Sequence, residues 1–360
     1  MNKELIKILA EKAKLDIPSV LSWPLSEEQE KERRKKEEDF NKFPPEYPPQ
    51  DLEWLSEHRN IKYRPDKILE GCRSVLVFSI NYYRKDFFYP NKEKSGSGLI
   101  SMYAAGRDYH KEFGGRLKKA ALLLKEMFPG HNFRAFTDSG PLDETWLAES
   151  TGIGFKGRNS LIITEKYGSW VFLGHILSTC TPEHLGVITK EKMSGNNKGK
   201  CPSLCSRCRD ACPTGAILPD GRVNVAKCIS YLTIEYKGII PAELSEKMGN
   251  RIFGCDECQI VCPFNSAAKE TDTAAFKKDI AGKYADLAEI LQIKNHHDMV
   301  EKYAGSPLMR AGRNNLVRNA CIAAVNIGRK ELLPYLEELT GDSNYSVKEH
   351  AKRAVKALTS

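Results

Sequence analysis

The sequence has no apolar run long enough to cross a lipid bilayer. A membrane-spanning helix needs about 18 or more mainly apolar residues in a row. The longest apolar stretches here, such as Val75–Ile80 and Trp170–Leu173, have the length of a β-strand. The opening segment, MNKELIKILAEKAKL, places Leu and Ile among Lys and Glu at helical spacing and lacks a secretory hydrophobic core. We therefore expect an amphipathic N-terminal helix, no membrane partner and a cytoplasmic location.

A strong excess of one charge and a glycine-rich phosphate loop are also missing. The chain carries 55 Lys and Arg against 47 Asp and Glu, a formal net charge of +8 that leans only mildly toward polyanions. Gly152, Gly154 and Gly157 do not follow a strand in the way that a dinucleotide-binding fold requires. With 41% hydrophobic and 28% charged residues, the 360-residue chain has the composition of a folded protein of one large domain or two to three modules.

Hydrophobic patterning predicts an α+β protein of three parts. Residues 1–180 alternate strand-like and helix-like segments and are expected to form an α/β domain behind an N-terminal helical segment. Residues 181–275 contain a polar linker and a cysteine-rich module, and residues 276–360 are expected to form a HEAT-like helical domain. The expected strands are 74–83, 132–137, 160–164 and 169–177, and the expected helices are 107–128, 141–150, 283–291, 308–327, 331–340 and 346–358.

The charged run Glu27–Asp39 (EEQEKERRKKEED) mixes both signs at i, i+4 spacing. This pattern predicts a solvated helix. The proline-rich segment Phe43–Gln50 (FPPEYPPQ) is expected to end that helix as a hinge.

Eight of the 11 cysteines fall between Cys201 and Cys262, in two runs that resemble bacterial ferredoxins. The runs are Cys201-x3-Cys205-x2-Cys208-x3-Cys212-Pro213 and Cys255-x2-Cys258-x3-Cys262-Pro263. In the ferredoxin pattern C-x2-C-x2-C-x3-C-P, the fourth cysteine ligates the other cluster.

The spacing therefore predicts two 4Fe–4S clusters. Ile252 stands where the second run lacks a thiolate, so Cys228, the remaining cysteine of the module, is assigned there. The first cluster is expected on Cys201, Cys205, Cys208 and Cys262, and the second on Cys212, Cys228, Cys255 and Cys258.

Two zinc knuckles are the alternative for this module, since crowded thiolates suit either metal. The three-residue gap after Cys201 is one residue longer than in ferredoxins and weakens the assignment of Cys201. The three remaining cysteines, Cys72, Cys180 and Cys321, lie in apolar contexts and are expected in the core.

Several longer motifs resemble the epoxyqueuosine reductase family, the cobalamin-dependent iron–sulfur enzymes of queuosine biosynthesis. The resemblance runs from about Tyr63 to Asn319. Its motifs are GRDYHK (Gly106–Lys111), FTDSGPLDE (Phe136–Glu144), LAESTGIGFKGRNSLI (Leu147–Ile162), GSWVFLG (Gly168–Gly174), DACPTGAI (Asp210–Ile217), KCISYLTIE (Lys227–Glu235) and GNRIFGCDECQIVCPFN (Gly249–Asn265). The resemblance implies reduction of epoxyqueuosine to queuosine at the wobble position of the tRNAs for Asp, Asn, His and Tyr.

The resemblance also implies a proton donor at Asp138, because an epoxide oxygen leaves poorly as an alkoxide. A buried carboxyl at the end of a strand can hold a proton through a raised pKa. The alternative role for Asp138 is a helix N-cap for a segment that begins at Pro141. Asp143 and Glu144 would then complement the helix dipole.

The family's cobalamin site maps onto seven positions of this chain, and electrons are expected to pass from the clusters to cobalamin. The residues implied are Arg64, Ser101, Asp138, Leu173, Ser230, Asp256 and Gln259. Ser230, Asp256 and Gln259 adjoin proposed cluster ligands, which would place the cofactor against the second cluster. The turn Lys156–Asn159 (KGRN) is a further candidate for lining the same cavity.

Basic residues predict where tRNA binds, because phosphate contacts need Lys and Arg. We expect contacts from Lys237, Arg313, Lys352 and Arg353. The C-terminal helices also carry Arg310, Arg318, Arg329, Lys330, Lys348 and Lys356, and solvated helix faces are the alternative for any one of these residues.

Two other functions stay open at this point: a cobalamin-dependent reductive dehalogenase, and a non-catalytic electron carrier or cobalamin-handling protein. We expect a monomer with an electron donor that the sequence does not identify.

Overall fold

The computed structural model describes residues 2–42, 58–87, 96–138, 140–186 and 199–360, and it divides into two compact units. The first unit contains residues 1–81, 109–205 and 264–269; the second contains 82–108, 206–263 and 270–360. The three-part division at residues 180 and 275 remains a prediction. Within the described residues, no helix combines the length and the apolar character needed to cross a membrane.

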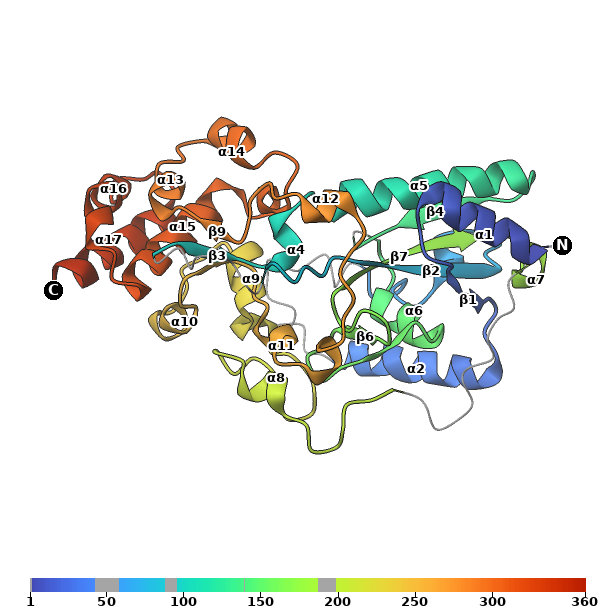
Figure 1. The fold of residues 1–360 in the computed structure, drawn as a ribbon. Helices are drawn as coiled ribbons and strands as arrows, with labels where there is room; N and C mark the ends of the chain where they lie inside the picture. The colour runs from blue at the N-terminus through green and yellow to red at the C-terminus, as the bar shows by residue number, and fades with distance from the viewer. Residues whose placement is uncertain (1, 43–57, 88–95, 139, 187–198) are drawn as a thin grey trace. The chain divides into compact units, whose positions relative to one another are not determined.

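The first unit is built on a four-stranded sheet in the order β1-β2-β7-β4 (Figure 1). Its strands are β1 (Ser19–Ser22), β2 (Ser74–Asn81), β7 (Val171–Ser178) and β4 (Phe133–Phe136). Every neighbouring pair is antiparallel. The expected α/β domain is therefore wrong in its sheet type, because α/β folds pair parallel strands through helical crossovers. The unit is α+β.

Helices cover both faces of this sheet, which is why β2 is buried along nearly its whole length. On one face, Val75 and Val77 share a core with Trp146 and Leu147 of α6 (Glu144–Ser150). On the other, α5 (Tyr109–Met127) packs on β4 and β7, and α1 (Asn2–Ala13) packs on α5.

The close approach of α5 to the sheet depends on a glycine in β7. A Cβ built at Gly174 would lie 2.5 Å from Leu117 Cδ1, so a larger residue at this position would push α5 away from the sheet.

The charged run forms α2 (Glu27–Asn41), which begins with a capping box between Ser26 and Gln29. The expectation of a wholly solvated helix needs a correction at Arg33. Its side chain is only 6% exposed and pairs with Glu30 at 2.9 Å and Glu37 at 2.8 Å. The proline-rich segment 43–50 lies outside the described residues.

The first unit also contains two short strands outside the four-stranded sheet. Strands β5 (Gly154–Lys156) and β6 (Ile162–Thr164) pair as an antiparallel hairpin. A four-residue helix, α7 (Pro182–Leu185), follows β7 along the chain.

The second unit combines a three-stranded sheet, the cysteine-rich segment and the C-terminal helices (Figure 1). Strand β3 (Gly98–Ile100) lies between β8 (Arg251–Phe253), which is parallel to it, and β9 (Tyr284–Ala285), which is antiparallel. The helix expected at 283–291 is wrong at its start, because Tyr284 pairs in the sheet and α13 begins only at Leu287, with Asp286 as its cap.

The C-terminal helices of this unit pack around one apolar core together with β3, β8 and β9. α15 packs against both α13 and α17, and α16 packs against α17. The C-terminal helices are α13 (Leu287–Leu291), α14 (His296–Tyr303), α15 (Gly312–Asn326), α16 (Leu333–Leu339) and α17 (Tyr345–Thr359). The short helices of the cysteine-rich segment are α8 (Arg207–Asp210), α9 (Ile229–Ile234), α10 (Ala242–Lys247) and α11 (Glu257–Ile260).

Candidate active site and cluster-binding region

Asp138 lies two residues beyond the end of β4, in the left-handed backbone region at φ +55°. This conformation is uncommon for a residue with a side chain, although Asp and Asn adopt it more readily than most. The Asp138 side chain is 50% exposed. The expectation of a buried carboxyl is therefore wrong for the first unit taken by itself, because the turn carries the residue out of the sheet.

Two side chains from the start of α5 hold the Asp138 carboxylate. The Tyr109 hydroxyl donates to Asp138 Oδ2 at 2.5 Å, and His110 Nε2 lies 3.2 Å from the same oxygen. The Tyr109 ring stacks on Phe172 of β7, with ring centroids 4.1 Å apart. The motif GRDYHK therefore supplies two partners of Asp138, Tyr109 and His110, whose role the sequence alone did not indicate.

Asp138 is not the cap of the helix that follows. α6 begins at Glu144, and its N-cap is Asp143, whose side chain accepts a hydrogen bond from the Trp146 amide at 2.8 Å. The helix-cap alternative for Asp138 is therefore wrong, as is the start of the helix at Pro141. Asp138 is left available for another role.

Two other residues implied for cobalamin belong to the first unit. The Leu173 carbonyl accepts a hydrogen bond from the Thr137 hydroxyl at 2.8 Å, which places Leu173 beside the Asp138 turn. Arg64 pairs with Asp66 at 2.6 Å, on the short 3-10 helix Pro65–Lys67.

The second unit brings Ser101 and Asp256 together. The Ser101 hydroxyl donates to Asp256 Oδ1 at 2.5 Å, and the Met102 amide donates to Oδ2 at 2.8 Å. Burial raises the pKa of Asp256 to about 6, against the lowering effect of these hydrogen bonds. Gln259 is also buried, and its side-chain oxygen accepts from the Tyr82 hydroxyl at 3.3 Å.

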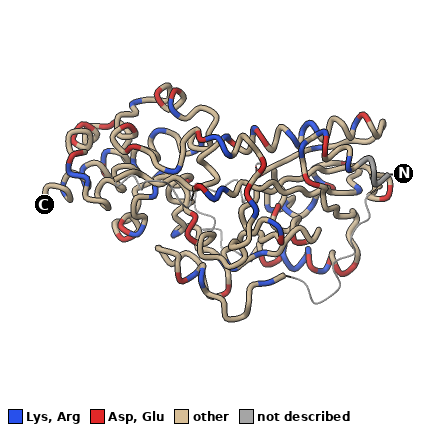
Figure 2. Tube along the Cα trace, viewed as in Figure 1, with Lys and Arg blue, Asp and Glu red and all other residues tan. Residues whose placement is uncertain are grey.

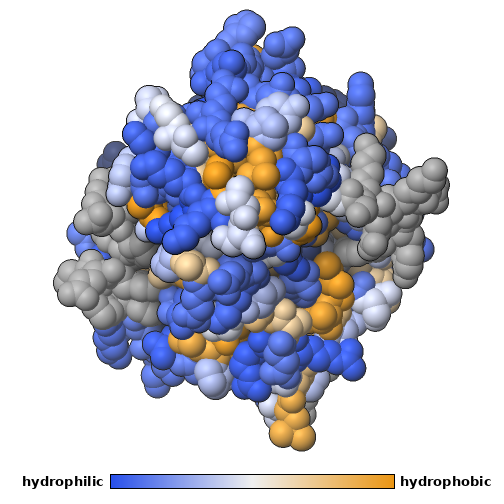
Figure 3. Space-filling view, turned by 90° about the vertical axis from the view of Figure 1, so that its left-hand side faces the viewer, coloured by the Kyte–Doolittle hydropathy of each residue, from blue (hydrophilic) through white to orange (hydrophobic). Residues whose placement is uncertain are grey.

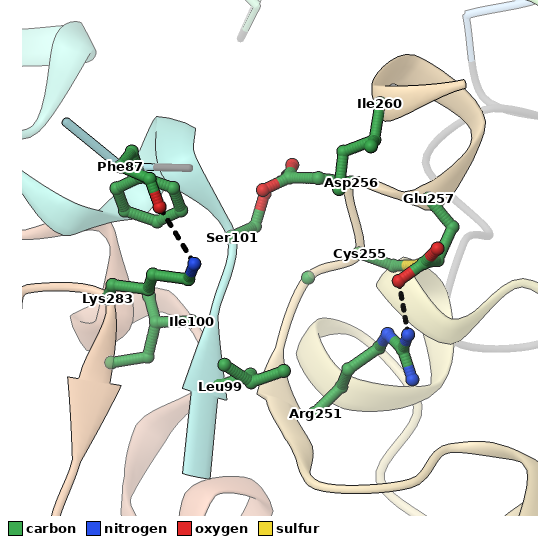
Figure 4. A pocket seen from close by; sticks show the side chains of 11 residues that line it. Phe87, Leu99, Ile100, Ser101, Arg251, Cys255, Asp256, Glu257, Ile260 and Lys283 are labelled. Carbon is green, nitrogen blue, oxygen red and sulfur yellow. Dashed lines mark hydrogen bonds and ion pairs between the residues drawn. The ribbon is translucent and has the colours of Figure 1, made fainter. Parts of the chain in front are cut away.

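A cavity of about 70 Å³ borders this pair (Figure 4). Its other lining includes Cys255, Phe87 and Lys283, whose ammonium donates to the Phe87 carbonyl at 2.7 Å. Ligand pockets usually measure roughly 300–1,000 Å³, so this cavity by itself does not enclose a corrin.

The structure gathers the four cysteines predicted for the second cluster. Besides burial, the charges of Cys255 and Cys228, and that of Cys208 from the first predicted set, raise the pKa of Cys258, and the charge of Cys212 raises that of Cys228. Burial raises the pKa of Cys228, of Cys258 and of Cys255, the last to about 12. Buried thiols that face one another stay protonated unless a metal compensates the thiolate charge, so this donor set fits a metal cluster.

Backbone amides also point at these sulfurs. Cys228 is the N-cap of α9, where the nearby Ser230 and Tyr231 amides oppose the rise of its pKa without a side-chain capping hydrogen bond, while Cys212 accepts from the Ala216 amide at 3.3 Å. Such bonds favour the thiolate form and tune cluster potentials. Ser230, implied for cobalamin, is partly buried in the first turn of α9.

The cysteines predicted for the first cluster are divided between the two units. Cys208, on α8, and Cys262, after α11, belong to the second unit, where α8 packs against α11. Cys201 and Cys205 belong to the first unit. Among the described residues, no three His, Cys, Asp or Glu side chains converge closely enough for a single metal ion.

The three cysteines outside the module are buried, as predicted, and all 11 are free of disulfides. Burial raises the pKa of Cys72 to about 11 and that of Cys321 to about 12.

Helix α15 holds the segments that carry the second cluster's cysteines. The Asn319 amide donates to the Thr233 carbonyl of α9 at 2.9 Å and to the Ile252 carbonyl of β8 at 2.8 Å. The Thr233 hydroxyl accepts from the amide of Gly254, the residue before Cys255, at 2.9 Å. Sequence reasoning missed this role of Asn319, because its full burial and its two backbone partners become visible only in the folded structure.

The basic residues expected to bind tRNA separate into exposed and buried ones. Lys237, Lys352 and Arg353 are exposed, and the face shown in Figure 3 is mostly hydrophilic. Arg313 is 13% exposed and pairs with Asp342 at 2.6 Å. Arg318 is fully buried and donates to the Leu232 carbonyl at 2.6 Å, so its suggested phosphate contact is wrong.

Two protein-family models match the chain. The model described as "Epoxyqueuosine reductase QueG, DUF1730" matches residues 62–139, and "4Fe-4S double cluster binding domain" matches residues 200–265. The second match favours iron–sulfur clusters over zinc for the cysteine module.

Curated relatives and solved structures carry the same name. The epoxyqueuosine reductase of Francisella cf. novicida is 37% identical over 281 residues, covering 77% of this chain and 75% of that protein. A crystal structure of epoxyqueuosine reductase with an epoxyqueuosine-modified tRNA-Tyr stem loop matches with a TM-score of 0.82 and 25% identity, covering 100% of this chain and 92% of that one.

A Bacillus subtilis epoxyqueuosine reductase, solved with its catalytic aspartate loop swung out of the active site, matches with a TM-score of 0.78 and 26% identity. The match covers 99% of this chain and 91% of that one.

Proposed function

This chain belongs to the epoxyqueuosine reductase family, and we propose that it reduces epoxyqueuosine in tRNA to queuosine. The observation that carries the proposal is the sequence match to relatives named for this activity over more than two thirds of their length. It favours this reaction over a reductive dehalogenase or a non-catalytic electron carrier. The conversion of an epoxide to an alkene takes up two electrons and two protons and releases the oxygen as water.

Electrons enter through two 4Fe–4S clusters in this proposal. Cys201, Cys205, Cys208 and Cys262 hold the first cluster, and Cys212, Cys228, Cys255 and Cys258 hold the second. The electrostatic influence among Cys212, Cys228, Cys255 and Cys258 supports their proximity, and Cys208 of the first set also influences Cys258. The donor that reduces the clusters is a separate protein or small reductant.

Cobalamin is the proposed second cofactor. When bound, it would supply a low-valent cobalt centre to the epoxide. Ser101, Asp256 and Gln259 offer a hydroxyl, a carboxyl and an amide next to Cys255 and Cys258, and this polar set fits the amide-rich edge of a corrin. Arg64, Leu173 and Ser230 complete the proposed contacts, and the turn 156–159 is a further candidate.

Asp138 is proposed to donate a proton to the leaving epoxide oxygen. Tyr109 and His110 hold its carboxylate from one side, so the carboxyl has a defined direction before substrate arrives. Half of the side chain remains exposed in the first unit, where a substrate oxygen can reach it.

Proposed tRNA contacts come from the exposed basic residues of the second unit. Lys237 follows α9, and Lys352 and Arg353 lie on α17, where Lys and Arg recur along the helix (Figure 2). The substrate tRNAs are those for Asp, Asn, His and Tyr, and the enzyme is expected to act in the cytoplasm as a monomer.

An assay with Asp138→Asn as its control tests this function. Anaerobically reconstituted protein, supplied with a chemical reductant and epoxyqueuosine-containing tRNA, is expected to convert the nucleoside to a product lighter by one oxygen atom in mass spectrometry. Asp138→Asn should keep its iron and cobalamin yet lose about 10²-fold or more in rate, because Asn cannot donate the proton.

Wild-type protein with full cofactor content that leaves epoxyqueuosine intact would overturn the proposed activity. Wild-type rates in Asp138→Asn would overturn the role of Asp138 alone.

A further inference from the structure

We infer that Glu144 is a positioning residue that fixes the Asp138 turn through the Asp138 backbone amide. The inference rests on the proposed function and deepens it, since it says what holds the proton donor in its working position. All of the residues that carry it belong to the first unit.

The first observation is the contact itself. Glu144 Oε1 accepts a hydrogen bond from the Asp138 amide at 2.8 Å. Asp138 occupies the left-handed region at φ +55°, a conformation that persists only where surrounding contacts over-determine it. A side-chain oxygen placed on this amide satisfies it and stabilises the turn.

The second observation is how Glu144 itself is held. It is the first residue of α6, directly after the Asp143 cap, so the helix fixes its backbone. Its Oε1 also lies 3.5 Å from Nδ1 of His175 on β7. His175 is fully buried, and neither ring nitrogen has a hydrogen-bond partner within the described residues.

The ring nitrogen Nδ1 of His175, a buried residue of β7, therefore faces the Glu144 carboxylate. The His175 ring stacks on Phe136, the last residue of β4, with centroids 5.4 Å apart, and the two residues are direct partners across the β4–β7 ladder. Burial raises the pKa of Glu144, and His175 opposes that shift. The arrangement links the end of β4, the Asp138 turn and the start of α6.

The hydrogen bond from the Asp138 amide to Glu144 constrains the backbone of the turn. Tyr109 and His110 contact the Asp138 side chain, whereas Glu144 accepts a hydrogen bond from the backbone amide of that residue, and its charge also interacts with the Asp138 carboxylate. Removal of the Glu144 acceptor should therefore release the turn, and a Gln at this position separates that effect from the loss of the nearby negative charge. In the Bacillus subtilis relative a catalytic aspartate loop has been observed swung out of the active site, so a loop of that kind can occupy a second position.

Three variants test this role. Glu144→Ala removes the acceptor and should lower the single-turnover rate at saturating tRNA by roughly tenfold, the effect of losing about one hydrogen bond. Glu144→Gln keeps a side-chain oxygen at the same place and should stay within about twofold of wild type. Asp143→Ala removes the cap of α6 without removing the acceptor, and so controls for simple loss of helix stability.

A second measurement does not depend on turnover. Hydrogen–deuterium exchange of the peptide covering residues 133–142 should quicken in Glu144→Ala and stay near wild type in Glu144→Gln. The Michaelis constant for tRNA should not change in either variant.

Two results would overturn the inference. One is equal exchange and equal rate in Glu144→Ala and wild type. The other is a Glu144→Gln variant as slow as Glu144→Ala, which would make charge, and not the acceptor at the amide, the cause. An inactive wild type would instead count against the proposed function, while the exchange data would still decide the role of Glu144.

Discussion

At the scale of single residues, burial and neighbours separate the cysteines into two kinds. Cys72 is 4% exposed, and its thiol donates to the Ser74 carbonyl at 3.5 Å, as a small apolar core residue does. Cys228 lies at the start of a helix, with backbone amides near its sulfur and Cys212 within electrostatic reach. Identical side chains therefore have different chemistry because of where the fold places them.

The iron content of two cysteine variants tests the assignment of Cys228. Reconstituted wild type should carry about eight irons, two cubane clusters, and little zinc. Cys228→Ala should drop to about four, because the second cluster loses a ligand. Cys72→Ala is the matched control and should keep the full complement. Equal iron in the two variants would reject Cys228 as the eighth ligand.

At the scale of elements, side chains of α15 and α17 clamp the segment that follows α9. Arg318 donates to the Tyr236 carbonyl at 2.5 Å, and Ser346 donates to the Gly238 carbonyl at 2.8 Å. His350 accepts from the Ile240 amide at 3.3 Å, and its other ring nitrogen donates to the Ser346 carbonyl at 2.7 Å. The C-terminal helices therefore order the segment that presents Lys237.

This clamp predicts a loss of stability in mild acid. Burial, with the positive charges of Arg318 and Arg353, lowers the pKa of His350 from 6.5 to about 4. The unfolded chain then binds more protons than the folded one between about pH 4 and 6.5, so stability should fall as the pH drops through this window. The full effect is at most about 3 kcal/mol, the free energy of this pKa difference.

Thermal melting of wild type and His350→Gln at pH 7.5 and pH 5 measures this effect. The variant removes the titrating group, so its melting temperature should fall less between the two pH values than that of wild type. Acid effects on the clusters are common to both proteins and cancel in the comparison. An identical fall in both proteins would show that His350 does not titrate in this window.

At the scale of the whole molecule, a net charge of +8 says little until the fold shows which cations face solvent. Arg313 pairs with Asp342, and Arg318 donates hydrogen bonds to backbone carbonyls inside the second unit. Lys237, Lys352 and Arg353 remain exposed, and Arg353 also donates to the Ile240 carbonyl at 3.1 Å, close along the chain to Lys237. The proposed tRNA contacts therefore concentrate on α17 and the segment beside it.

Charge reversal tests this surface. Lys237→Glu, Lys352→Glu and Arg353→Glu combined should weaken tRNA binding and flatten its salt dependence, because each lost phosphate contact lowers the slope of log K against log salt by about 0.7–0.9. Reversal of Lys12, Lys118 and Lys119, exposed on α1 and α5, changes the net charge equally and serves as the control. Equal binding curves for the two triple variants would place the tRNA site elsewhere.

Arg313→Glu is expected to behave differently from these surface variants. It would put a carboxylate against Asp342 in a partly buried position, so its main effect should be on folding, and not on the salt dependence of tRNA binding.

The sequence by itself determined the features that depend on residues close together in the chain. Cysteine spacing and the Cys-Pro ends predicted an iron–sulfur module, and motifs such as FTDSGPLDE and GCDECQ carried the family resemblance that the relatives confirm. Strand and helix periodicity located β2, β7, α5 and α17 to within a few residues. These signals are local, because ligand spacing and amphipathic period are properties of neighbouring residues.

Only the tertiary structure decided what depends on distant partners. The antiparallel sheet, the strand at Tyr284, the burial of Arg318 and the exposure of Asp138 each follow from contacts between segments far apart in the chain. The same holds for Asn319, which joins α9 to β8, and for His175 behind Glu144. A side chain's burial and its hydrogen-bond partner are set by packing, and no spacing rule contains that information.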